Sequence, residues 1–78
     1  MIYLNSNATK KKIKELAEAN GYSATDISKA IGLSTQAVYA WYSDTKKQMP
    51  TIDNLVILAN LFQCSLDDLI VFDFENGA

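Results

Sequence analysis

The chain has 78 residues, 49% of them apolar, and a formal charge of −2 from seven lysines and nine carboxylates. We expect one domain with one small core, since domains typically contain about 100–150 residues. A single cysteine excludes an intramolecular disulfide framework, and the lack of histidine removes the usual catalytic base and metal ligand. Apolar runs such as residues 55–59 are far shorter than the roughly 20 residues of a membrane span. The sequence therefore predicts a small, soluble binding domain from a reducing compartment.

The charge is divided unevenly along the chain. Residues 1–66 contain all seven lysines and five carboxylates, a net charge of +2, whereas residues 67–78 contain four carboxylates and no base. Within the single domain 1–78 we therefore assign residues 71–78 to an acidic C-terminal tail. Net negative charge disfavours non-specific binding to nucleic acid. Because the acidity is concentrated at one end, it does not exclude a nucleic-acid partner for the rest of the chain.

Apolar spacing and cap residues predict three short helices between residues 8 and 43. The second helix opens at Ser23, with Asp26 three residues later in the manner of a capping box, and Gly32 ends it. The third opens at Ser34 and is broken by the polar segment that follows it. Their buried faces are predicted to contain Ile13, Leu16 and Ala17, then Ile27, Ala30 and Ile31, then Val38 and Trp41.

Two further helices follow a polar loop that ends at Pro50. Thr51 caps the fourth helix, and Ser65, with Asp68 three residues later, caps the fifth. Their core-facing residues are predicted to be Ile52, Leu55, Leu58, Ala59 and Phe62, then Leu66, Leu69 and Ile70. Five short helices with short connections describe an all-α fold, a compact five-helix bundle.

The two ends of the chain differ from the helical part. Residues 2–4 and 70–74 are rich in β-branched and aromatic side chains, which favour strands. Two arrangements remain open at this point. Either the ends pair as a short β-ribbon, within one chain or between two, or the N-terminus frays and the fifth helix runs on by one turn.

Residues 24–43 have the pattern of a helix-turn-helix. Such a unit needs a residue that tolerates the left-handed conformation between two short helices packed at a steep angle, and Gly32 provides it. The apolar contacts expected to fix the angle come from Ala30, Ile31, Leu33, Val38 and Trp41. The polar first turn of the third helix, residues 34–36, is then free to project outward. Short hydrogen-bonding side chains at a helix N-terminus suit the base edges of a DNA major groove.

Five motifs occur in a fixed order between residues 13 and 69. They are Ile13-x-x-Leu16, Asp26-Ile27-x-x-Ala30-Ile31-Gly32-Leu33-Ser34, Gln36-Ala37-Val38-x-x-Trp41, Pro50-Thr51-x-x-x-Leu55-x-x-Leu58-Ala59 and Phe62-x-Cys64-Ser65-Leu66-Asp67-Asp68-Leu69. In order and spacing they resemble the Cro/phage-repressor (XRE-type) helix-turn-helix family. The resemblance implies a lambda-repressor-like five-helix domain over residues 13–69. It also implies sequence-specific binding of double-stranded DNA as a dimer, usually to regulate transcription.

The resemblance assigns DNA-binding roles by position. The base-reading positions are Thr35, Gln36, Tyr39 and Ala40, and the phosphate-contacting positions are Ser23, Ser34, Ser43, Lys46 and Lys47. Gln36 is the strongest candidate, because its amide can bond an adenine at two atoms, which gives about 1–3 kcal/mol of discrimination. The serines at helix N-termini would contact phosphates where the helix dipole favours anions.

The sequence departs from the family pattern near these positions. Tyr42 stands where many members have Glu, Asp44 where they have Gly, and Ala24 where a Gln often contacts phosphate. The small Ala17 in the first helix is expected to accommodate Tyr42. The chain also has no arginine, so it lacks the side chain that reads guanine with two hydrogen bonds. These departures affect the phosphate contacts and the affinity more than the fold.

The fourth helix is more apolar than its core stripe requires, since Val56, Ile57 and Leu61 are apolar as well. A second apolar stripe must be covered, and the apolar chain ends are available to do so. We therefore predict a homodimer whose interface contains Ile57, Leu61, Val71, Phe72 and Phe74. Such a dimer would place two recognition helices about 34 Å apart on a pseudo-palindromic operator.

Several conspicuous residues have an ordinary structural interpretation. Trp41 is predicted to lie in the core, and Cys64 to be a buried structural thiol. The lysine-rich run 10–14 wraps around the first helix and is predicted to be solvated. Tyr39 and Tyr42, by contrast, are predicted to be exposed aromatic side chains that contact DNA or a protein.

The leading hypothesis is a dimeric, sequence-specific DNA-binding repressor, cytoplasmic and encoded by a bacterium or a phage. The alternative is a protein-interaction module (an antirepressor, antitoxin or inhibitor) that reuses the scaffold. DNA binding predicts that Ser34, Gln36, Lys46 and Lys47 share one face free of carboxylates, whereas a protein binder would show Asp44 and the tail intruding on it. No enzymatic activity, metal, cofactor, small-molecule ligand or membrane partner is expected.

Overall fold

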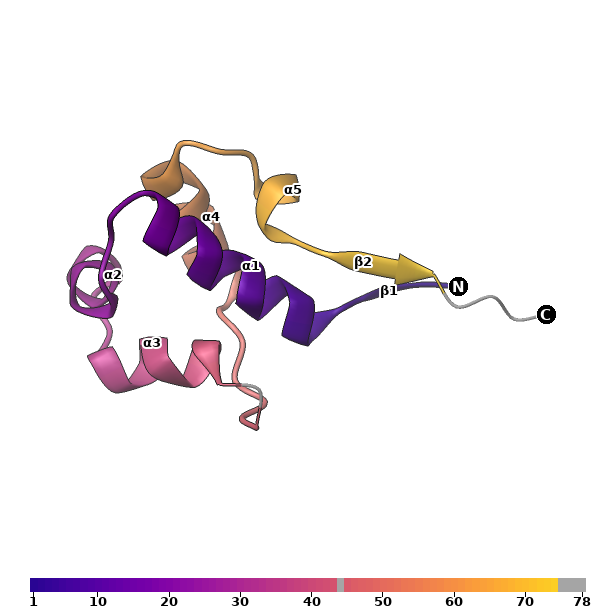
Figure 1. The fold of residues 1–78 in the computed structure, drawn as a ribbon, viewed down its shortest axis with the longest axis horizontal. Helices are drawn as coiled ribbons and strands as arrows, with labels where there is room; N and C mark the ends of the chain where they lie inside the picture. The colour runs from indigo at the N-terminus through magenta and orange to yellow at the C-terminus, as the bar shows by residue number, and fades with distance from the viewer. Residues whose placement is uncertain (44, 75–78) are drawn as a thin grey trace.

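The computed structural model describes residues 1–43 and 45–74. In chain order the elements are β1 (Ile2–Leu4), α1 (Ser6–Ala19), α2 (Ala24–Ile31), α3 (Thr35–Tyr42), α4 (Ile52–Phe62), α5 (Leu66–Leu69) and β2 (Phe72–Phe74). The helices form one body, and the two strands extend away from it as a ribbon (Figure 1). The predicted five-helix bundle is confirmed, and the ribbon that the sequence left open is present.

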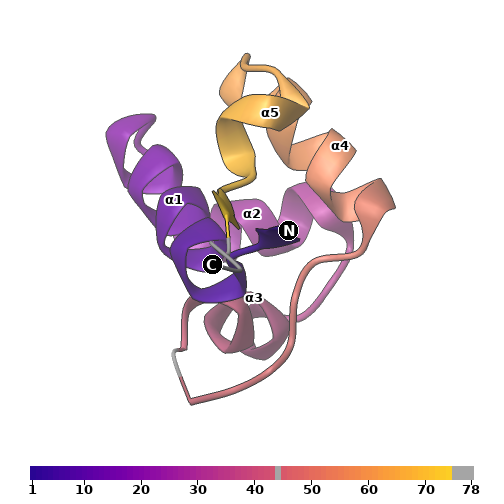
Figure 2. The same ribbon diagram turned by 90° about the vertical axis from the view of Figure 1, so that its right-hand side faces the viewer.

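One apolar core holds the helices together. In this core α1 packs against α3 and α5, and α2 packs against α3 and α4. The buried apolar residues are Ile13, Ala17, Ala24, Ile27, Val38, Trp41, Leu55, Leu58, Ala59, Phe62 and Leu69. Each of the larger side chains contributes about 1.5–3 kcal/mol by leaving water. Viewed along the ribbon, α3 lies on the side of the body opposite α5 (Figure 2).

Side-chain caps determine where the helices begin. The Ser23 hydroxyl accepts a hydrogen bond from the Asp26 N–H at 3.1 Å, and the Asp26 carboxylate accepts one from the Ser23 N–H at 2.9 Å. The Ser34 hydroxyl accepts from the Ala37 N–H at 3.2 Å at the start of α3. These predicted caps are confirmed, as is the cap at Thr51.

The first helix begins at Ser6, two residues earlier than expected. Its N-cap is Asn5, whose side-chain oxygen accepts a hydrogen bond from the Ala8 N–H at 2.9 Å. The Asn5 N–H donates to the Val71 carbonyl at 2.8 Å, and its amide donates to the Asp73 carboxylate. One residue therefore both caps α1 and joins it to the second strand.

The chain ends form a β-ribbon within one chain, which decides between the two arrangements left open by the sequence. The strands are antiparallel, and their register pairs Ile2 with Phe74, Tyr3 with Asp73 and Leu4 with Phe72. The fifth helix ends at Leu69 and does not run on. Thr9, fully buried in α1, accepts a hydrogen bond from the Val71 N–H at 3.0 Å and so anchors the ribbon to the helical body.

Three residues predicted to be buried are exposed. Ile52 is 61% exposed because it is the first residue of α4, and Leu33, at 41%, lies in the turn after α2. Ala30 is exposed because α2 turns Ser28 toward the core in its place. The buried Ser28 hydroxyl is satisfied by donating to the Thr25 carbonyl at 2.8 Å. Apolar spacing predicted the helices correctly, but it did not predict which residues lie at the edges of their buried faces.

Candidate nucleic-acid interface

The turn between α2 and α3 has the geometry that the sequence predicts. Gly32 adopts a left-handed conformation with φ +82°, and its N–H donates to the Ser28 carbonyl at 2.8 Å. The Leu33 N–H donates to the same carbonyl at 3.1 Å. A side chain at Gly32 would meet no atom within 4 Å, so the backbone angle alone favours glycine. The chain thus turns sharply into α3 at Ser34.

The outer face of α3 is exposed, and its inner face is in the core. Val38 is fully buried and Trp41 is 4% exposed, which confirms the predicted core position of the tryptophan. Gln36 is exposed and Tyr39 is 61% exposed. Thr35 and Ala40 are partly buried. The proposed base-reading residues therefore form a shallow surface in which Gln36 and Tyr39 project furthest.

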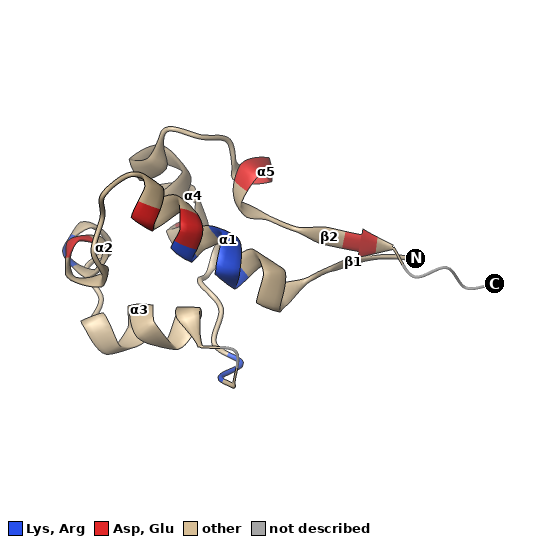
Figure 3. Ribbon diagram, in the orientation of Figure 1, with Lys and Arg blue, Asp and Glu red and all other residues tan. Residues whose placement is uncertain are grey.

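The charge around this surface is low on α3 and positive in the loop that follows. No residue of α3 is charged, and the exposed side chains of Lys46 and Lys47 come after its end (Figure 3). The acidic residues of α5 and β2 lie on other parts of the body, with α5 on the opposite side from α3. Asp44, whose position was expected to distinguish a DNA-binding protein from a protein-interaction module, lies outside the described residues. The described residues of α3 and of the loop after it carry no carboxylate, whereas Glu18 of α1 and Asp26 of α2 lie beside this face.

Ser23 lies across a hollow from the outer face of α3. The hollow has a volume of about 360 Å³ and is lined by Lys14, Ala17, Glu18, Tyr22, Ser23, Ala24, Tyr39 and Tyr42. At Ser23 both the hydroxyl and the N–H are used in the capping box with Asp26. The hydroxyl can still accept or donate a further bond at this exposed position. The structure thus brings the start of α2 and the middle of α3 to one concave surface.

Tyr42 is not the exposed aromatic residue that the sequence predicted. It is partly buried and packs against the core, with α1 contributing Ala17 to the same hollow. Its ring meets that of Tyr39 edge to face at 6.5 Å, and the Lys14 ammonium lies 6.0 Å from its centre. Burial, and then the negative charge of Glu18, raises the pKa of the Tyr42 hydroxyl. Tyr42 therefore packs edge to face against the Tyr39 ring, and Tyr39 is the exposed aromatic side chain of the pair.

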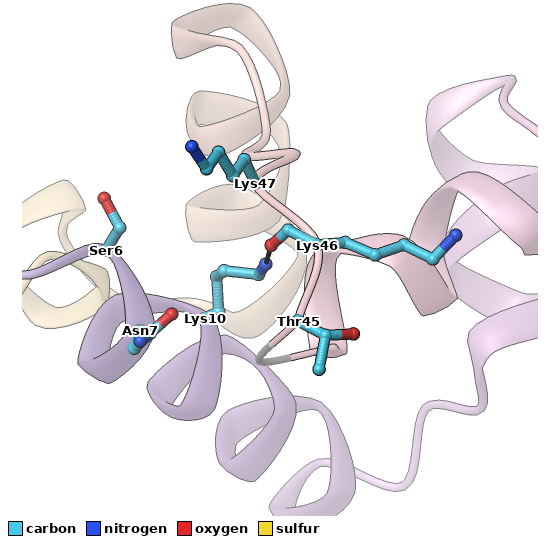
Figure 4. Close-up of a pocket in the computed structure, with 6 residues that line it drawn as sticks. All are labelled: Ser6, Asn7, Lys10, Thr45, Lys46 and Lys47. Atoms are coloured by element: carbon cyan, nitrogen blue, oxygen red, sulfur yellow. Dashed lines mark hydrogen bonds between the residues drawn. The ribbon is translucent and has the colours of Figure 1, made fainter.

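The lysine-rich run of α1 is only partly solvated, contrary to the prediction. Lys11, Lys12 and Lys14 are exposed, but Lys10 is 2% exposed. Its ammonium donates hydrogen bonds to the carbonyl of Ser43 at 2.7 Å and to that of Lys46 (Figure 4). This residue was missed because a lysine within a run of lysines gives no signal of burial.

The phosphate-contacting candidates after α3 lie close together in the chain and in space. Ser43 is the C-cap of α3, and its hydroxyl shares a hydrogen bond with that of Thr45 at 3.0 Å. Lys46 and Lys47 follow on the same loop. Together with Ser34 at the other end, they extend the α3 surface in both directions.

The predicted dimer residues lie on two separate elements. Ile57, 38% exposed, and the partly buried Leu61 are on α4, whereas Phe72 and Phe74 are on the ribbon. Val71 is partly buried where the ribbon joins the body. Leu61 also packs against the core, and its carbonyl lies 3.5 Å from the Tyr22 hydroxyl. The two elements therefore present two apolar patches rather than one.

Cys64 is partly buried rather than fully buried. Burial, and then the negative charge of Asp68, raises the pKa of its thiol. The described residues contain no cluster of side chains that could hold a metal ion. They also contain no helix with the length and apolar character needed to cross a membrane.

Comparison with known proteins identifies the family. A search among curated proteins finds no match. A family model for the helix-turn-helix of the Cro/C1 (XRE) type matches residues 13–69, which include the whole of α2, α3, α4 and α5. Domains of this family are DNA-binding regulatory modules. The chain therefore belongs to the Cro/C1-type (XRE) helix-turn-helix family.

Proposed function

We propose that the protein is a sequence-specific regulator of transcription that binds double-stranded DNA and reads the major groove with α3. The observation that carries the proposal is the outer face of α3, which is exposed, uncharged and polar in its first turn. Lys46 and Lys47 follow it directly. Base edges are read by hydrogen-bonding side chains, whereas phosphates are held by lysines and helix N-termini. The chain presents both kinds of group on one side.

Base reading is assigned to Thr35, Gln36, Tyr39 and Ala40. Gln36 is exposed in the first turn of α3, from which a side chain can reach into a major groove. Its amide offers a donor and an acceptor to adenine, while Ala40 offers a methyl contact. Tyr39 adds an exposed ring whose position is supported by Tyr42.

Phosphate contacts are assigned to Ser23, Ser34, Ser43, Lys46 and Lys47. Ser34 lies at the N-terminus of α3, where N–H groups and the helix dipole favour anions and no acidic residue is present in the first turn. At the start of α2 the Asp26 carboxylate already accepts the Ser23 N–H, so Ser23 would offer a phosphate its hydroxyl alone. The two lysines supply the only full positive charges in this set. With so few cations, we expect weak binding to random DNA, and a large share of the affinity from base contacts and dimerisation.

We further propose that the protein acts as a homodimeric repressor, which occludes a promoter by binding a pseudo-palindromic site. The ribbon supports this proposal, because alternate residues of a strand share a face and one face is entirely apolar. That face contains Ile2, Leu4, Phe72 and Phe74, which are 62%, 44%, 53% and 72% exposed. Three of these residues line an open hollow of about 420 Å³.

A second copy of the chain is the occupant that this face fits. A two-stranded ribbon is marginally stable in water unless its apolar face is covered. The face carries no charge, so two copies related by a two-fold axis meet apolar surface to apolar surface without like-charge repulsion. A dimer also provides the second α3 that a two-fold operator requires.

Selection of bound duplexes from a random pool tests the proposed function. The expected result is enrichment of one motif with two inverted half-sites. Failure to enrich any motif would overturn the proposal. It would favour the alternative, a protein-interaction module (an antirepressor, antitoxin or inhibitor), for which the exposed apolar face of the ribbon would be the interface.

A further inference from the structure

Lys10 is a buried cation in a chain with few cations. Lysine is almost never fully buried unless its ammonium is paired, because removing that charge from water is costly. Lys10 is 2% exposed, while its neighbours Lys11 and Lys12 are exposed on the same helix. The fold therefore buries one positive charge, and the hydrogen bonds of the Lys10 ammonium indicate which part of the chain it stabilises.

The Lys10 ammonium bridges two main-chain carbonyls. It donates to the Ser43 carbonyl at 2.7 Å and to the Lys46 carbonyl, so one side chain of α1 holds both ends of a short loop segment. Hydrogen bonds from a charged donor are roughly twice as strong as neutral ones. Because both acceptors are backbone atoms, the bonds hold the main chain at Ser43 and at Lys46 whatever the side chains there are.

The same ammonium lies at the C-terminal end of α3. Carbonyls at a helix C-terminus have no partner within the helix and carry partial negative charge, which a nearby cation stabilises. The last turn of α3 contains no basic residue. Ser43 is the C-cap of α3, and its carbonyl accepts from Lys10. Lys10 of α1 thus places a cation at the C-terminus of α3, whose own last turn contains none.

Figure 4 shows a division between the three lysines of this region. The Lys10 ammonium points to the Lys46 carbonyl, whereas the ammonium groups of Lys46 and Lys47 extend away from the loop in different directions. A hollow of about 390 Å³ separates the start of α1 from the loop and is lined by Ser6, Asn7, Lys10, Thr45, Lys46 and Lys47. One lysine is used to hold the loop, and two remain available to an external anion.

We propose that Lys10 is a positioning residue for phosphate binding: it fixes the loop after α3 so that Lys46 and Lys47 reach the DNA backbone, and it does not contact DNA itself. The inference rests on the proposed function for its DNA readout. The anchoring of the loop can also be measured on the free protein.

The central test is Lys10→Met, which keeps the length of the side chain and removes its charge and donors. Binding to the selected duplex is measured over a range of salt concentrations. Each lost phosphate contact lowers the slope of log K against log salt by about 0.9. We expect Lys10→Met to lower the slope by about 1–2, close to the effect of the double variant Lys46→Ala/Lys47→Ala. Adding Lys10→Met to that double variant should then change the slope little further.

The matched control is Lys12→Met, which removes the same charge from an exposed position of the same helix. It should leave the slope within about 0.3 of the wild-type value, because the effect of Lys10 depends on its bonds to the loop. The conservative variant Lys10→Arg keeps a charged donor and should restore at least half of the lost slope. Equal effects of Lys10→Met and Lys12→Met would overturn the proposal.

Amide hydrogen exchange without DNA separates this inference from the proposed function. In Lys10→Met, exchange of the Ser43 and Thr45 amides, which donate hydrogen bonds to the Ala40 carbonyl and the Ser43 hydroxyl, should accelerate at least tenfold, while the buried amides of α4 stay protected. If Lys10→Met does not fold, Lys10→Gln, which retains one donor, replaces it and should show the same local effect in part. Wild-type exchange of these amides in a folded variant would overturn the anchoring role, even if the variant bound DNA more weakly. A wild-type protein that binds no duplex would overturn the proposed function instead.

Discussion

Gln36 is the residue on which specificity is expected to depend most. It is exposed on α3, and its amide can form two hydrogen bonds with one adenine, which gives about 1–3 kcal/mol of discrimination. We expect Gln36→Ala to relax the preference at one base position while the salt dependence of binding is unchanged. Competition binding with operators altered one base pair at a time measures this. A specificity profile that stays as in the wild type would contradict the proposed docking of α3.

Lys46 and Lys47 are expected to act on all sequences alike. A phosphate contact carries no base information, so Lys46→Ala or Lys47→Ala should weaken specific and random duplexes by the same factor. Each change should also lower the salt slope by about 0.9. Titrations at several salt concentrations with a cognate and a scrambled duplex make the comparison. Loss of binding to the cognate duplex alone would show that these lysines read bases instead.

Asp26, at the start of α2, makes the stability of the folded protein depend on pH. The hydrogen bonds from the Ser23 N–H and hydroxyl, with Lys29 nearby, hold the pKa of the Asp26 carboxyl below its usual value of 3.8. The folded state therefore binds this proton less readily than the unfolded state. The resulting stability is present above pH 3.8 and is lost as the pH falls through the lowered pKa of the folded state.

Asp26→Asn tests this coupling. Thermal unfolding between pH 2 and pH 6 should show a smaller loss of stability at acid pH in Asp26→Asn than in the wild type. Glu15→Gln, an exposed change within α1, is the control and should keep the wild-type acid limb. Identical acid limbs in Asp26→Asn and the wild type would exclude a role for the capping box in acid unfolding.

Among the elements, the ribbon is joined to α1 by a buried hydroxyl as well as by the bonds of Asn5. Thr9 is fully buried, and its oxygen accepts the Val71 N–H at 3.0 Å. Thr9→Val keeps the shape of the side chain but leaves that N–H without a partner. An unpaired buried donor costs about 1–3 kcal/mol. Urea denaturation should therefore show a destabilisation of this size.

Thr25→Val is the control for the Thr9 prediction. Thr25 is exposed, and its main-chain carbonyl, which the substitution keeps, accepts the hydrogen bond from the Ser28 hydroxyl. We expect a change within about 0.5 kcal/mol, as for most surface substitutions. If Thr9→Val were as stable as Thr25→Val, the anchoring of the ribbon through Thr9 would be refuted.

The starts of two helices could be predicted from the sequence, whereas the end of a third could not. The starts of α2 and α3 follow from Ser23 and Ser34, because a cap is made by atoms within three residues of each other. The end of α4 could not be predicted from a glycine, because Gln63 adopts the left-handed conformation there with φ +54°. A cap formed by a residue with a side chain leaves no clear signal in the sequence.

At the scale of the whole molecule, the projecting ribbon is expected to control association. We predict that Phe74→Ser, on the apolar face, weakens self-association at least tenfold while the helical body remains folded. Sedimentation equilibrium at tens of micromolar, with and without the selected duplex, measures it. A wild-type protein that is strictly monomeric under both conditions would refute the dimer.

Ile52→Ser is the matched control for the dimer prediction. Ile52 is 61% exposed, comparable to Phe74, but it lies on α4, away from the ribbon. The variant should associate as the wild type does. If instead Ile52→Ser dissociated the dimer and Phe74→Ser did not, the interface would involve α4, which also carries the exposed Ile57.

The sequence by itself determined the number and order of the helices, the caps at Ser23, Ser34 and Thr51, the turn at Gly32 and the resemblance to the family. These features depend on side-chain periodicity and on contacts within a few residues, both of which are visible in a single chain. It also identified the polar first turn of α3 as the candidate reading surface, whose role awaits the binding experiments.

Only the tertiary structure decided how distant segments use one another. The bonds from Lys10 to the loop span 33 and 36 residues, and the bond between Thr9 and Val71 spans 62. It also decided that the ribbon closes within one chain, and that Ile52 lies outside the core despite its helical spacing. A net charge of −2 could not show that one lysine is buried at the end of α3, because burial depends on which helix lies next to which.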